Sequence, residues 1–217
     1  MKTIAFVNQK GGVGKTSLAA SISVAAAESG ETVIALDLDP QASLAAWGEQ
    51  RTAATPVVDR LGADKLAQLP QILKALETRG FTLAVLDCPG TFSTAMNLVM
   101  ESIELALVPA RPTRLDIQAS RPTIQALLRF QRPFLFVLNQ CSSIPRSTRA
   151  NEAAAGLSAL GSLASPLIIQ RTDHQDAIAA GKGVTEFAPA GKGADEIRTL
   201  WQCISETLTP RQKALVA

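Results

Sequence analysis

The stretch NQKGGVGKTS at residues 8–17 decides the fold of this chain of 217 residues. The apolar run TIAFVN at residues 3–8 leads into it, and an alanine-rich segment without turn residues, residues 16–29, follows it. Glycines between a strand and a helix let backbone N–H groups surround an anion at the helix N-terminus, where the helix dipole favours negative charge. The stretch therefore predicts a phosphate-binding loop between a buried strand and a helix.

Two side chains of this loop add specific chemistry. Lys15 is placed to reach the β- and γ-phosphates of a nucleotide, and the Thr16 hydroxyl is placed to ligate Mg²⁺. The usual pattern begins with glycine where this chain has Gln9, and a second lysine, Lys10, stands inside the loop. The residues expected to bind the nucleotide are Gly11, Gly12, Val13, Gly14, Lys15, Thr16 and Ser17.

Apolar segments alternate with helix-like segments along the rest of the chain. Further strands are predicted at residues 32–36, 81–86, 106–109, 134–138 and 166–169. Helices are predicted at residues 16–29, 66–79, 115–131, 150–165 and 195–208, and Pro122 is expected to kink or restart one of them. The alternation predicts an α/β fold, a mostly parallel twisted sheet with helices on both faces, in a single domain over residues 1–217.

The composition excludes several kinds of site. The chain has no tyrosine and a single histidine, His174, so neither a tyrosine nucleophile nor a multi-histidine metal site is available. Cys88, Cys141 and Cys203 form no C-x-x-C pair, which argues against a zinc ribbon or an iron–sulfur cluster within one chain. Without a signal peptide or an apolar run of membrane-spanning length, the sequence predicts a cytoplasmic protein with no membrane partner.

The small net charge of +2 hides an uneven distribution. Residues 111–149 contain seven arginines and one acidic residue, Asp116, whereas residues 1–110 are net acidic. A block of this kind indicates an anionic partner, although a solvated helix surface explains it equally well. The arginines are Arg111, Arg114, Arg121, Arg129, Arg132, Arg146 and Arg149.

Four segments together resemble the ParA/MinD family of ATPases. KGGVGKT at residues 10–16 is similar to the family's deviant Walker A motif, and IALDLDPQ at residues 34–41 is similar to its switch I. LAVLDCPG at residues 83–90 resembles Walker B and switch II, and VPARPTRLD at residues 108–116 resembles the V-P-x-x-P-[ST] loop of short ParA proteins. The resemblance implies the SIMIBI type of P-loop NTPase fold, with ATP and Mg²⁺ as cofactors.

The resemblance also assigns roles to individual residues. It implies that Asp39 orients or deprotonates the attacking water and that Asp37 supports water bound to Mg²⁺. It places Asp87 as the Walker B carboxylate on Mg²⁺ and the backbone N–H of Gly90 on the γ-phosphate. Asn139, which follows the predicted strand at residues 134–138, is the implied adenine contact.

Lys10 is the residue that distinguishes this family from other P-loop enzymes. The resemblance implies that it reaches the phosphates of a partner subunit's ATP, so that ATP holds a homodimer together. It further implies slow ATP hydrolysis that a centromere-binding partner of the ParB or ParG type stimulates, nonspecific DNA binding on the nucleoid, and possible growth into higher polymers. Lys182, Lys192 and Arg198 join the arginine block as candidate phosphate contacts.

Two other functions share the same fold. A MinD-like membrane-positioning protein needs a C-terminal amphipathic helix, whereas Pro210 interrupts the C-terminal segment here and few bulky apolar residues follow it. A metabolic enzyme similar to dethiobiotin synthetase is the remaining alternative, which the D-P-Q and V-P-x-x-P segments disfavour. Because the chain begins at its first strand, it resembles the short, ParF-like class without an N-terminal helix-turn-helix domain, and operator-specific repression is not expected.

Overall fold

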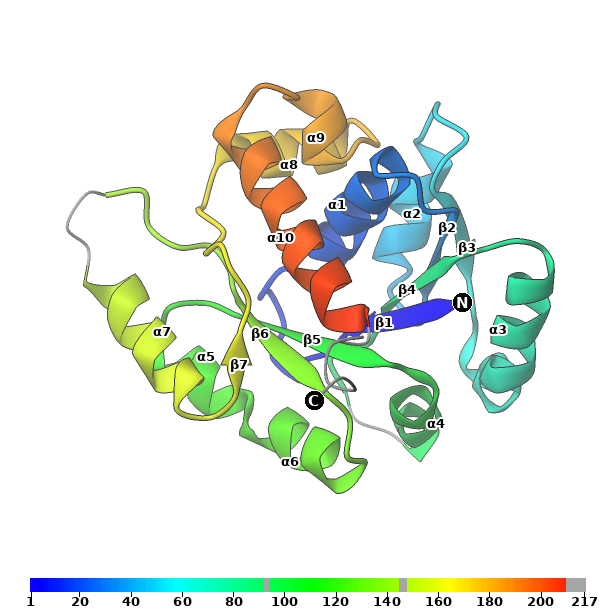
Figure 1. Ribbon diagram of the computed structural model, residues 1–217, viewed down its shortest axis with the longest axis horizontal. Coiled ribbons are helices and arrows are strands. Elements are labelled where there is room, and N and C mark those ends of the chain that lie inside the picture. The colour runs from blue at the N-terminus through cyan, green and yellow to red at the C-terminus, as the bar shows by residue number, and fades with distance from the viewer. Residues whose placement is uncertain (92–93, 145–147, 210–217) are drawn as a thin grey trace, which may run out of the picture.

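Seven parallel strands form the central sheet, in the spatial order β3-β2-β4-β1-β5-β6-β7 (Figure 1). The computed structural model describes residues 1–91, 94–144 and 148–209. The strands are β1 (Lys2–Phe6), β2 (Val33–Asp37), β3 (Val57–Arg60), β4 (Leu83–Asp87), β5 (Leu105–Ala110), β6 (Phe134–Leu138) and β7 (Ser162–Leu163). Strands β2, β3 and β4 lie on one side of β1, and strands β5, β6 and β7 lie on the other. Open α/β sheets place their ligand sites where the strand order changes sides in this way.

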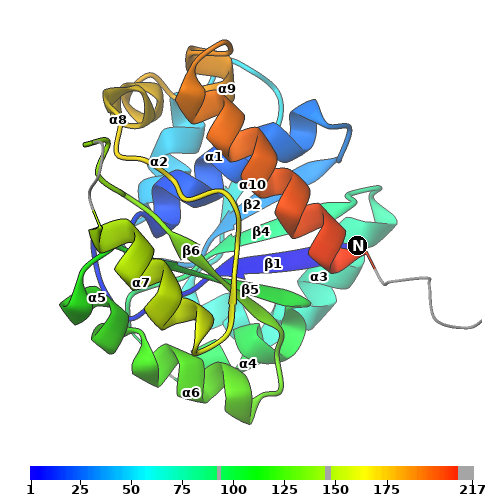
Figure 2. The same ribbon diagram turned by 60° about the vertical axis from the view of Figure 1, so that its left-hand side comes forward.

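Helices cover both faces of this sheet, as Figures 1 and 2 show. One face carries α1 (Lys15–Glu28), α2 (Ser43–Glu49), α8 (Thr172–Ala179), α9 (Val184–Phe187) and α10 (Lys192–Leu208). The other carries the 3₁₀ helix η1 (Ala63–Gln68), α3 (Leu69–Thr78), α4 (Thr94–Ser102), α5 (Arg114–Ala119), α6 (Arg121–Arg129) and α7 (Arg149–Ser158). The predicted α/β class with a parallel sheet between two helical layers is confirmed.

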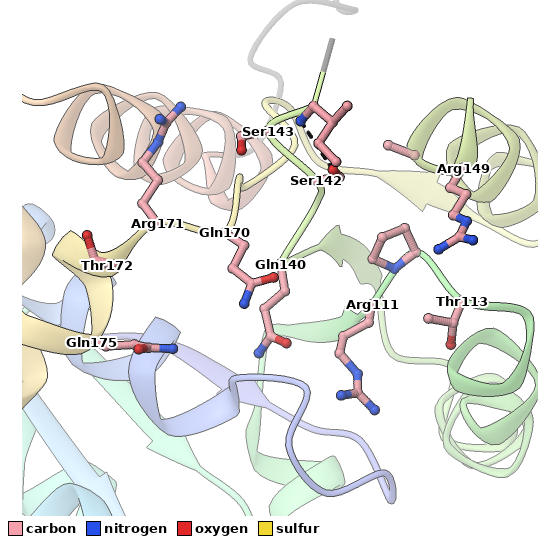
Figure 3. A pocket seen from close by; sticks show the side chains of 13 residues that line it. Arg111, Thr113, Gln140, Ser142, Ser143, Arg149, Gln170, Arg171, Thr172 and Gln175 are labelled. Carbon is pink, nitrogen blue, oxygen red and sulfur yellow. Dashed lines mark hydrogen bonds between the residues drawn. The ribbon is translucent and has the colours of Figure 1, made fainter. Parts of the chain in front are cut away.

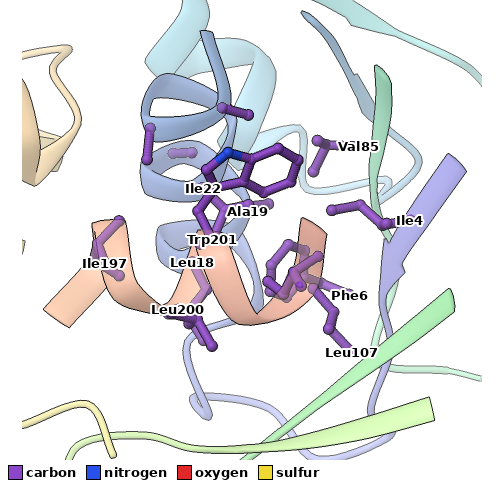
Figure 4. Packing of buried hydrophobic residues seen from close by; sticks show 14 of the residues in the cluster. Ile4, Phe6, Leu18, Ala19, Ile22, Val85, Leu107, Ile197, Leu200 and Trp201 are labelled. Atoms are coloured by element: carbon purple, nitrogen blue, oxygen red, sulfur yellow. The ribbon is translucent and has the colours of Figure 1, made fainter. Parts of the chain in front are cut away.

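The strands are buried on both faces, which is why they read as continuous apolar runs. In β1, Ile4 and Phe6 face the cluster beneath α1 and α10, and Ala5 faces the opposite cluster. Trp201 of α10 packs against α1 in the first cluster (Figure 4), and its Nε1 donates a hydrogen bond to Ser29 Oγ over 2.7 Å. Burial on two sides therefore holds β1, and with it the start of the glycine-rich loop, in one position.

Two sequence predictions were wrong near the far edge of the sheet. Residues 166–169 form no strand, and only a single bridge joins Ile169 to Cys141. The helix predicted over residues 150–165 ends at Ser158, because the N–H groups of Leu160 and Gly161 both turn back to the Leu157 carbonyl. The chain then enters β7, inside the range that was predicted as helix.

The predicted helix at residues 115–131 is divided at Ser120 into α5 and α6, with Pro122 in the first turn of α6 as expected. No strand was predicted at the position of β3, because its residues are largely exposed at the sheet edge and lack an apolar pattern. No helix within the described residues is both long enough and apolar enough to cross a membrane.

Candidate functional site

The carboxyl ends of the central strands bring the predicted site residues together. The glycine-rich loop follows β1, Asp37 ends β2, and Asp87 ends β4. Asp37 and Asp87 are register partners on neighbouring strands, and Asp87 is also the register partner of Phe6. Three motifs that lie far apart in the sequence thus meet at one edge of the sheet.

The glycine-rich loop has a backbone that only glycine adopts readily. Gly12 and Gly14 have φ angles of +73° and +92°, in the left-handed region. Gly14 caps α1, and a Cβ atom there would lie 2.3 Å from Asn139 Nδ2. Position 14 therefore excludes a side chain for two reasons, its backbone conformation and its contact with Asn139.

Asn139 holds this loop from the end of β6. Its Nδ2 donates a hydrogen bond to the Val13 carbonyl over 2.9 Å, and Gln140 Nε2 donates to the Gly12 carbonyl over 3.2 Å. Asn139 also lines a cavity of about 350 Å³ together with Ser17 and Leu18 of α1. Its position beside this cavity is compatible with a base contact, which stays a prediction, but its observed hydrogen bond supports the loop.

The pair Thr16 and Asp87 forms the side of the site that suits a cation. Thr16 Oγ1 donates a hydrogen bond to Asp87 Oδ2 over 2.6 Å, while the buried Asp87 Oδ1 has no hydrogen-bond partner among the described residues. Burial, with the like charges of Asp37 and Asp39, raises the pKa of Asp87 to about 7, although Thr16 and Lys15 act in the opposite direction.

A hard cation would relieve the unpaired carboxylate oxygen, and oxygen ligands are those that Mg²⁺ prefers. The described residues contain no group of three or more His, Cys, Asp or Glu side chains placed to hold a metal. A cation here would therefore rely on Thr16, Asp87, water and the oxygens of a bound phosphate.

The two switch I aspartates differ in their surroundings. Asp37 is fully buried; its Oδ1 accepts from the N–H of Asp39 and its Oδ2 accepts from the N–H of Ala45, both over 2.9 Å. Asp39 is half-buried, and its Oδ1 accepts from the N–H of Gln41. Asp37 thus fixes the turn into α2, while Asp39 is the more accessible carboxylate for a water molecule.

Gly90 brings switch II against the phosphate loop. A Cβ atom at this position would lie 3.5 Å from the Gln9 carbonyl oxygen and 3.8 Å from Lys15 Nζ. Lys15 itself is almost fully buried. The predicted phosphate ligands Lys15 and Gly90 therefore lie close together, on the side of the loop that faces Asp87.

Asn8, which sequence reasoning did not select, fixes the first half of the loop. Its Nδ2 donates to the Pro109 carbonyl over 2.7 Å and to Ser120 Oγ over 2.9 Å, and its Oδ1 accepts from the N–H of Lys10 over 3.0 Å. The N–H of Gln9 donates to Thr123 Oγ1 over 3.3 Å. The sequence signal that could have identified Asn8 is a polar residue directly after the apolar run of residues 3–7.

Lys10 is half-buried, and its ammonium makes no hydrogen bond or ion pair within the part of the chain that is described. Asp116 lies close enough to feel its charge. Burial alone would raise the pKa of Asp116, but hydrogen bonds from Arg111 and Thr113, helped by the charges of Arg111 and Lys10, lower it. The predicted lysine is therefore available to a ligand or to a second chain.

A polar basin of about 690 Å³ opens beside the loop (Figure 3). Arg111 and Gln140 point from its wall toward the glycine-rich loop in this view. Arg111 Nε and Nη2 donate to Asp116 over 2.8 and 3.1 Å, and Arg171 pairs with Glu196 over 2.6 Å. Two arginines of the basin are therefore neutralised by carboxylates.

The structure divides the arginine block. Arg111 is ion-paired, Arg132 donates to the Ile103 carbonyl, and Arg129 lies over the Phe130 ring. Arg146 is outside the described residues. Four members are exposed and make no hydrogen bond or ion pair with any described residue: Arg114, Arg121, Arg129 and Arg149.

Residues 4–184 match the family described as the CobQ/CobB/MinD/ParA nucleotide binding domain. Maintenance of carboxysome distribution protein A from Halothiobacillus neapolitanus is 29% identical over 210 residues, which cover 91% of this chain and 94% of that protein. The protein of the same name from Gloeobacter kilaueensis is 35% identical over 126 residues, and the match spans only 55% of its length and 57% of this chain. The chromosome-partitioning ATPase Soj of Thermus thermophilus is 27% identical over 92% of this chain and 94% of its own.

Solved structures share the fold across nearly the whole chain. The ATP complex of a Cyanothece McdA variant has a TM-score of 0.77 and 16% identity, and covers 100% of this chain and 99% of its own. MinD from Pyrococcus horikoshii, complexed with Mg-ADP, has a TM-score of 0.73 and 20% identity, with 98% and 99% coverage. These neighbours hold the cofactors that were predicted, ATP and Mg²⁺ with an adenine nucleotide. The chain therefore belongs to the CobQ/CobB/MinD/ParA family of nucleotide-binding proteins, and its fold is that of MinD and McdA.

Proposed function

We propose that this protein is an ATP-driven switch of the ParA type that acts in the partition of plasmid or chromosomal DNA. The observation that carries the proposal is the arrangement of two lysines in one loop. Lys15 is buried beside Gly90, whereas Lys10 is anchored through its backbone to Asn8 and keeps its ammonium free of partners among the described residues. One lysine is thus directed inward, and the other is available to a second subunit.

The chemistry requires positioning and charge neutralisation more than covalent steps. The N–H groups of the loop would surround the phosphates, and Lys15 would neutralise the transferred phosphoryl group. Thr16 and Asp87 would hold Mg²⁺, which when bound neutralises charge on the β- and γ-phosphates. Asp39 is the carboxylate proposed to orient the attacking water, because Asp37 already uses both oxygens to hold backbone N–H groups.

In the proposed dimer, Lys10 contacts the nucleotide of the partner subunit. Contacts that exist only in the dimer give ATP a higher affinity for the dimer than for the monomer, so ATP shifts the equilibrium toward the dimer. Hydrolysis removes the γ-phosphate and with it this difference in affinity. A partner of the ParB or ParG type would accelerate hydrolysis, and growth of dimers into polymers is a further state that size measurements detect.

DNA binding in the ATP state would place the protein on the nucleoid within the cytoplasm. Exposed basic side chains without ion pairs to described residues are the proposed phosphate contacts, and dimerisation doubles their number. Among the candidates predicted from the sequence, those assigned to DNA are Arg129, Lys182 and Lys192. Such contacts predict binding that has no sequence preference and that weakens steeply as the salt concentration rises.

A second candidate keeps the switch and changes the cargo. The Halothiobacillus relative, which matches more than nine tenths of both chains, is named for carboxysome distribution rather than for DNA. In that case the ATP dimer would bind DNA in the same way, while the stimulating partner would be attached to a protein assembly.

Sedimentation with ATP or ADP, with and without a DNA duplex, tests the proposal. The Asp39→Ala variant with ATP is expected to sediment as a dimer that binds DNA at low salt, and the ADP form as a monomer that does not. Lys10→Ala should stay monomeric with ATP, while Lys74→Ala, which removes an exposed lysine of α3, should dimerise normally. Dimerisation of the Lys10→Ala variant at wild-type ATP concentrations would refute the assigned role.

A further inference from the structure

A groove of about 630 Å³ lies between α5 and α7, which run side by side in Figures 1 and 2. We call it the α5–α7 groove. Its lining includes the apolar side chains of Ile117 on α5, Ala153 on α7 and Leu160 just after α7, and Leu160 is 48% exposed. Gly156 also lines it and leaves one stretch of the α7 wall without a side chain.

Cationic side chains surround this apolar lining. Arg114, Arg121 and Arg149 all line the groove, and none makes a hydrogen bond or ion pair with the described residues. Glu152 is the single acidic residue in the lining. The groove therefore combines an apolar floor with an excess of unpaired positive charge.

We propose that the α5–α7 groove binds an acidic amphipathic segment of a partner protein. The apolar side chains of such a segment would cover Ile117 and Leu160, and its carboxylates would pair with the guanidinium groups, whose planar donors suit carboxylates. DNA phosphates would use the arginines but would leave the apolar floor uncovered. A second copy that offered the same groove would bring like charges together.

The groove is connected to the phosphate loop through its own helices. Ser120, at the junction of α5 and α6, and Thr123, in α6, accept hydrogen bonds from Asn8 and from the Gln9 N–H. Arg149 also lines the basin beside the loop (Figure 3). A segment bound in the groove would therefore contact the helices whose side chains hold Asn8 and Gln9, next to Lys10. We expect such binding to change the rate of ATP hydrolysis. This last step rests on the proposed function, whereas the binding step does not.

Gly156 offers a direct way to block the groove. A Cβ atom at this position meets no heavy atom within 4 Å, so Gly156→Trp places a large side chain in the groove without a backbone clash. Ala155→Trp is the matched control, because Ala155 is exposed on the same helix and does not line the groove. For the charges, the Arg114→Gln/Arg121→Gln double variant is compared with Arg129→Gln, an exposed arginine of α6 outside the lining.

The probe is a fluorescein-labelled amphipathic peptide of about 18 residues with leucine on one helical face and glutamate on the other. Its anisotropy is measured with the full chain, and a peptide with lysine in place of glutamate serves as the reverse-charge control. We expect saturable binding of the glutamate peptide, about tenfold weaker binding for Gly156→Trp and for the arginine double variant, and changes within about twofold for both controls. Equal binding of the lysine peptide, or equal affinity of Gly156→Trp and Ala155→Trp, would overturn the proposal; thermal melting of each variant verifies that it is folded.

Two parallel measurements distinguish a protein segment from the other possible occupants of the groove, which are DNA and a second copy of this chain. If a DNA duplex displaces the peptide and Gly156→Trp weakens DNA binding by the same factor, the groove is a nucleic-acid site and the proposal fails. If Gly156→Trp abolishes the ATP-dependent dimer, the groove is a self-interface and the proposal also fails. Loss of peptide binding with an intact ATP-dependent dimer refutes only the groove, whereas peptide binding without any ATP-dependent dimer refutes only the proposed switch.

Discussion

Asn8 Nδ2 donates a hydrogen bond to Ser120 Oγ over 2.9 Å, and this contact joins the phosphate loop to helices that lie 112 residues later in the chain. Both side chains are buried. The same Asn8 amide accepts the N–H of Lys10, so one side chain places the backbone of the lysine proposed to act in the dimer. Lys10 is therefore positioned by tertiary contacts of its neighbour.

Asn8→Ala is expected to destabilise the protein by about 1–3 kcal/mol, because it leaves the Pro109 carbonyl and the Lys10 N–H without their buried partner. The free energy of unfolding from urea titration measures this loss. Asn151→Ala, which removes an exposed side chain of α7, is the control and should stay within about 0.5 kcal/mol of wild type. Equal stability of the two variants would contradict the role given to Asn8.

Gly14→Ala is expected to destabilise the nucleotide-free protein by about 1–3 kcal/mol, because alanine is strained at φ +92° and its Cβ displaces Asn139 from the Val13 carbonyl. Gly11→Ala is the matched comparison in the same loop. A Cβ at Gly11 meets no heavy atom within 4 Å, so that variant should lie within about 0.5 kcal/mol of wild type. Urea midpoints without nucleotide measure both, and a ranking in the opposite order would show that the loop relaxes freely.

Asp87→Asn is expected to become progressively more stable than wild type as the pH rises from about 4 to about 7. The folded-state pKa of Asp87 is raised from 3.8 to about 7, first by burial, so the folded protein keeps a proton that the unfolded chain has released. Its ionisation therefore costs stability above that range, on the order of 4 kcal/mol.

Urea unfolding in EDTA at several pH values between 4 and 8.5 measures this difference between wild type and Asp87→Asn. Asp176→Asn, at an exposed position of α8, serves as the control and should run parallel to wild type. Parallel curves for wild type and Asp87→Asn would contradict the raised pKa.

Glu186→Gln is expected to destabilise the protein by about 1–3 kcal/mol at pH 7, because it leaves a buried guanidinium with a weaker partner. Glu186 accepts hydrogen bonds from Arg51 Nη1 and Nη2 over 3.0 and 2.9 Å, and the Arg51 side chain is 3% exposed. Burial alone would raise the pKa of Glu186, but Arg51 and the N–H of Gly183 lower it below 4.5. The stabilisation is therefore complete above about pH 4.5 and is lost as the pH falls further.

The stability of Glu186→Gln relative to wild type is measured by urea unfolding at pH 7 and pH 3.5. The gap between them should shrink at the lower pH. Glu49→Gln, on the exposed end of α2, should show no gap at either pH, and a gap that grows on acidification would contradict the assignment.

Sequence patterns were sufficient to predict the central strands of the sheet and the phosphate loop. Strands such as β1 and β4 are buried on both faces, so they have to be continuous apolar runs, and the glycines of the loop reflect left-handed backbone that few other residues adopt. The edge strands β3 and β7 lack this double burial, and their residues consequently carried no such pattern.

The sequence by itself therefore determined which segments form the central strands and that polar site residues follow β1, β2 and β4, because local backbone geometry and burial dictate these patterns. Only the tertiary structure showed that Asn8 anchors Lys10, that Asp37 is occupied by backbone N–H groups, and that Arg111 is neutralised by Asp116. It also showed that three arginines surround one apolar groove. Such relationships depend on which distant segments meet across the sheet. The pattern of residues along one segment does not indicate which residue of another segment it will contact.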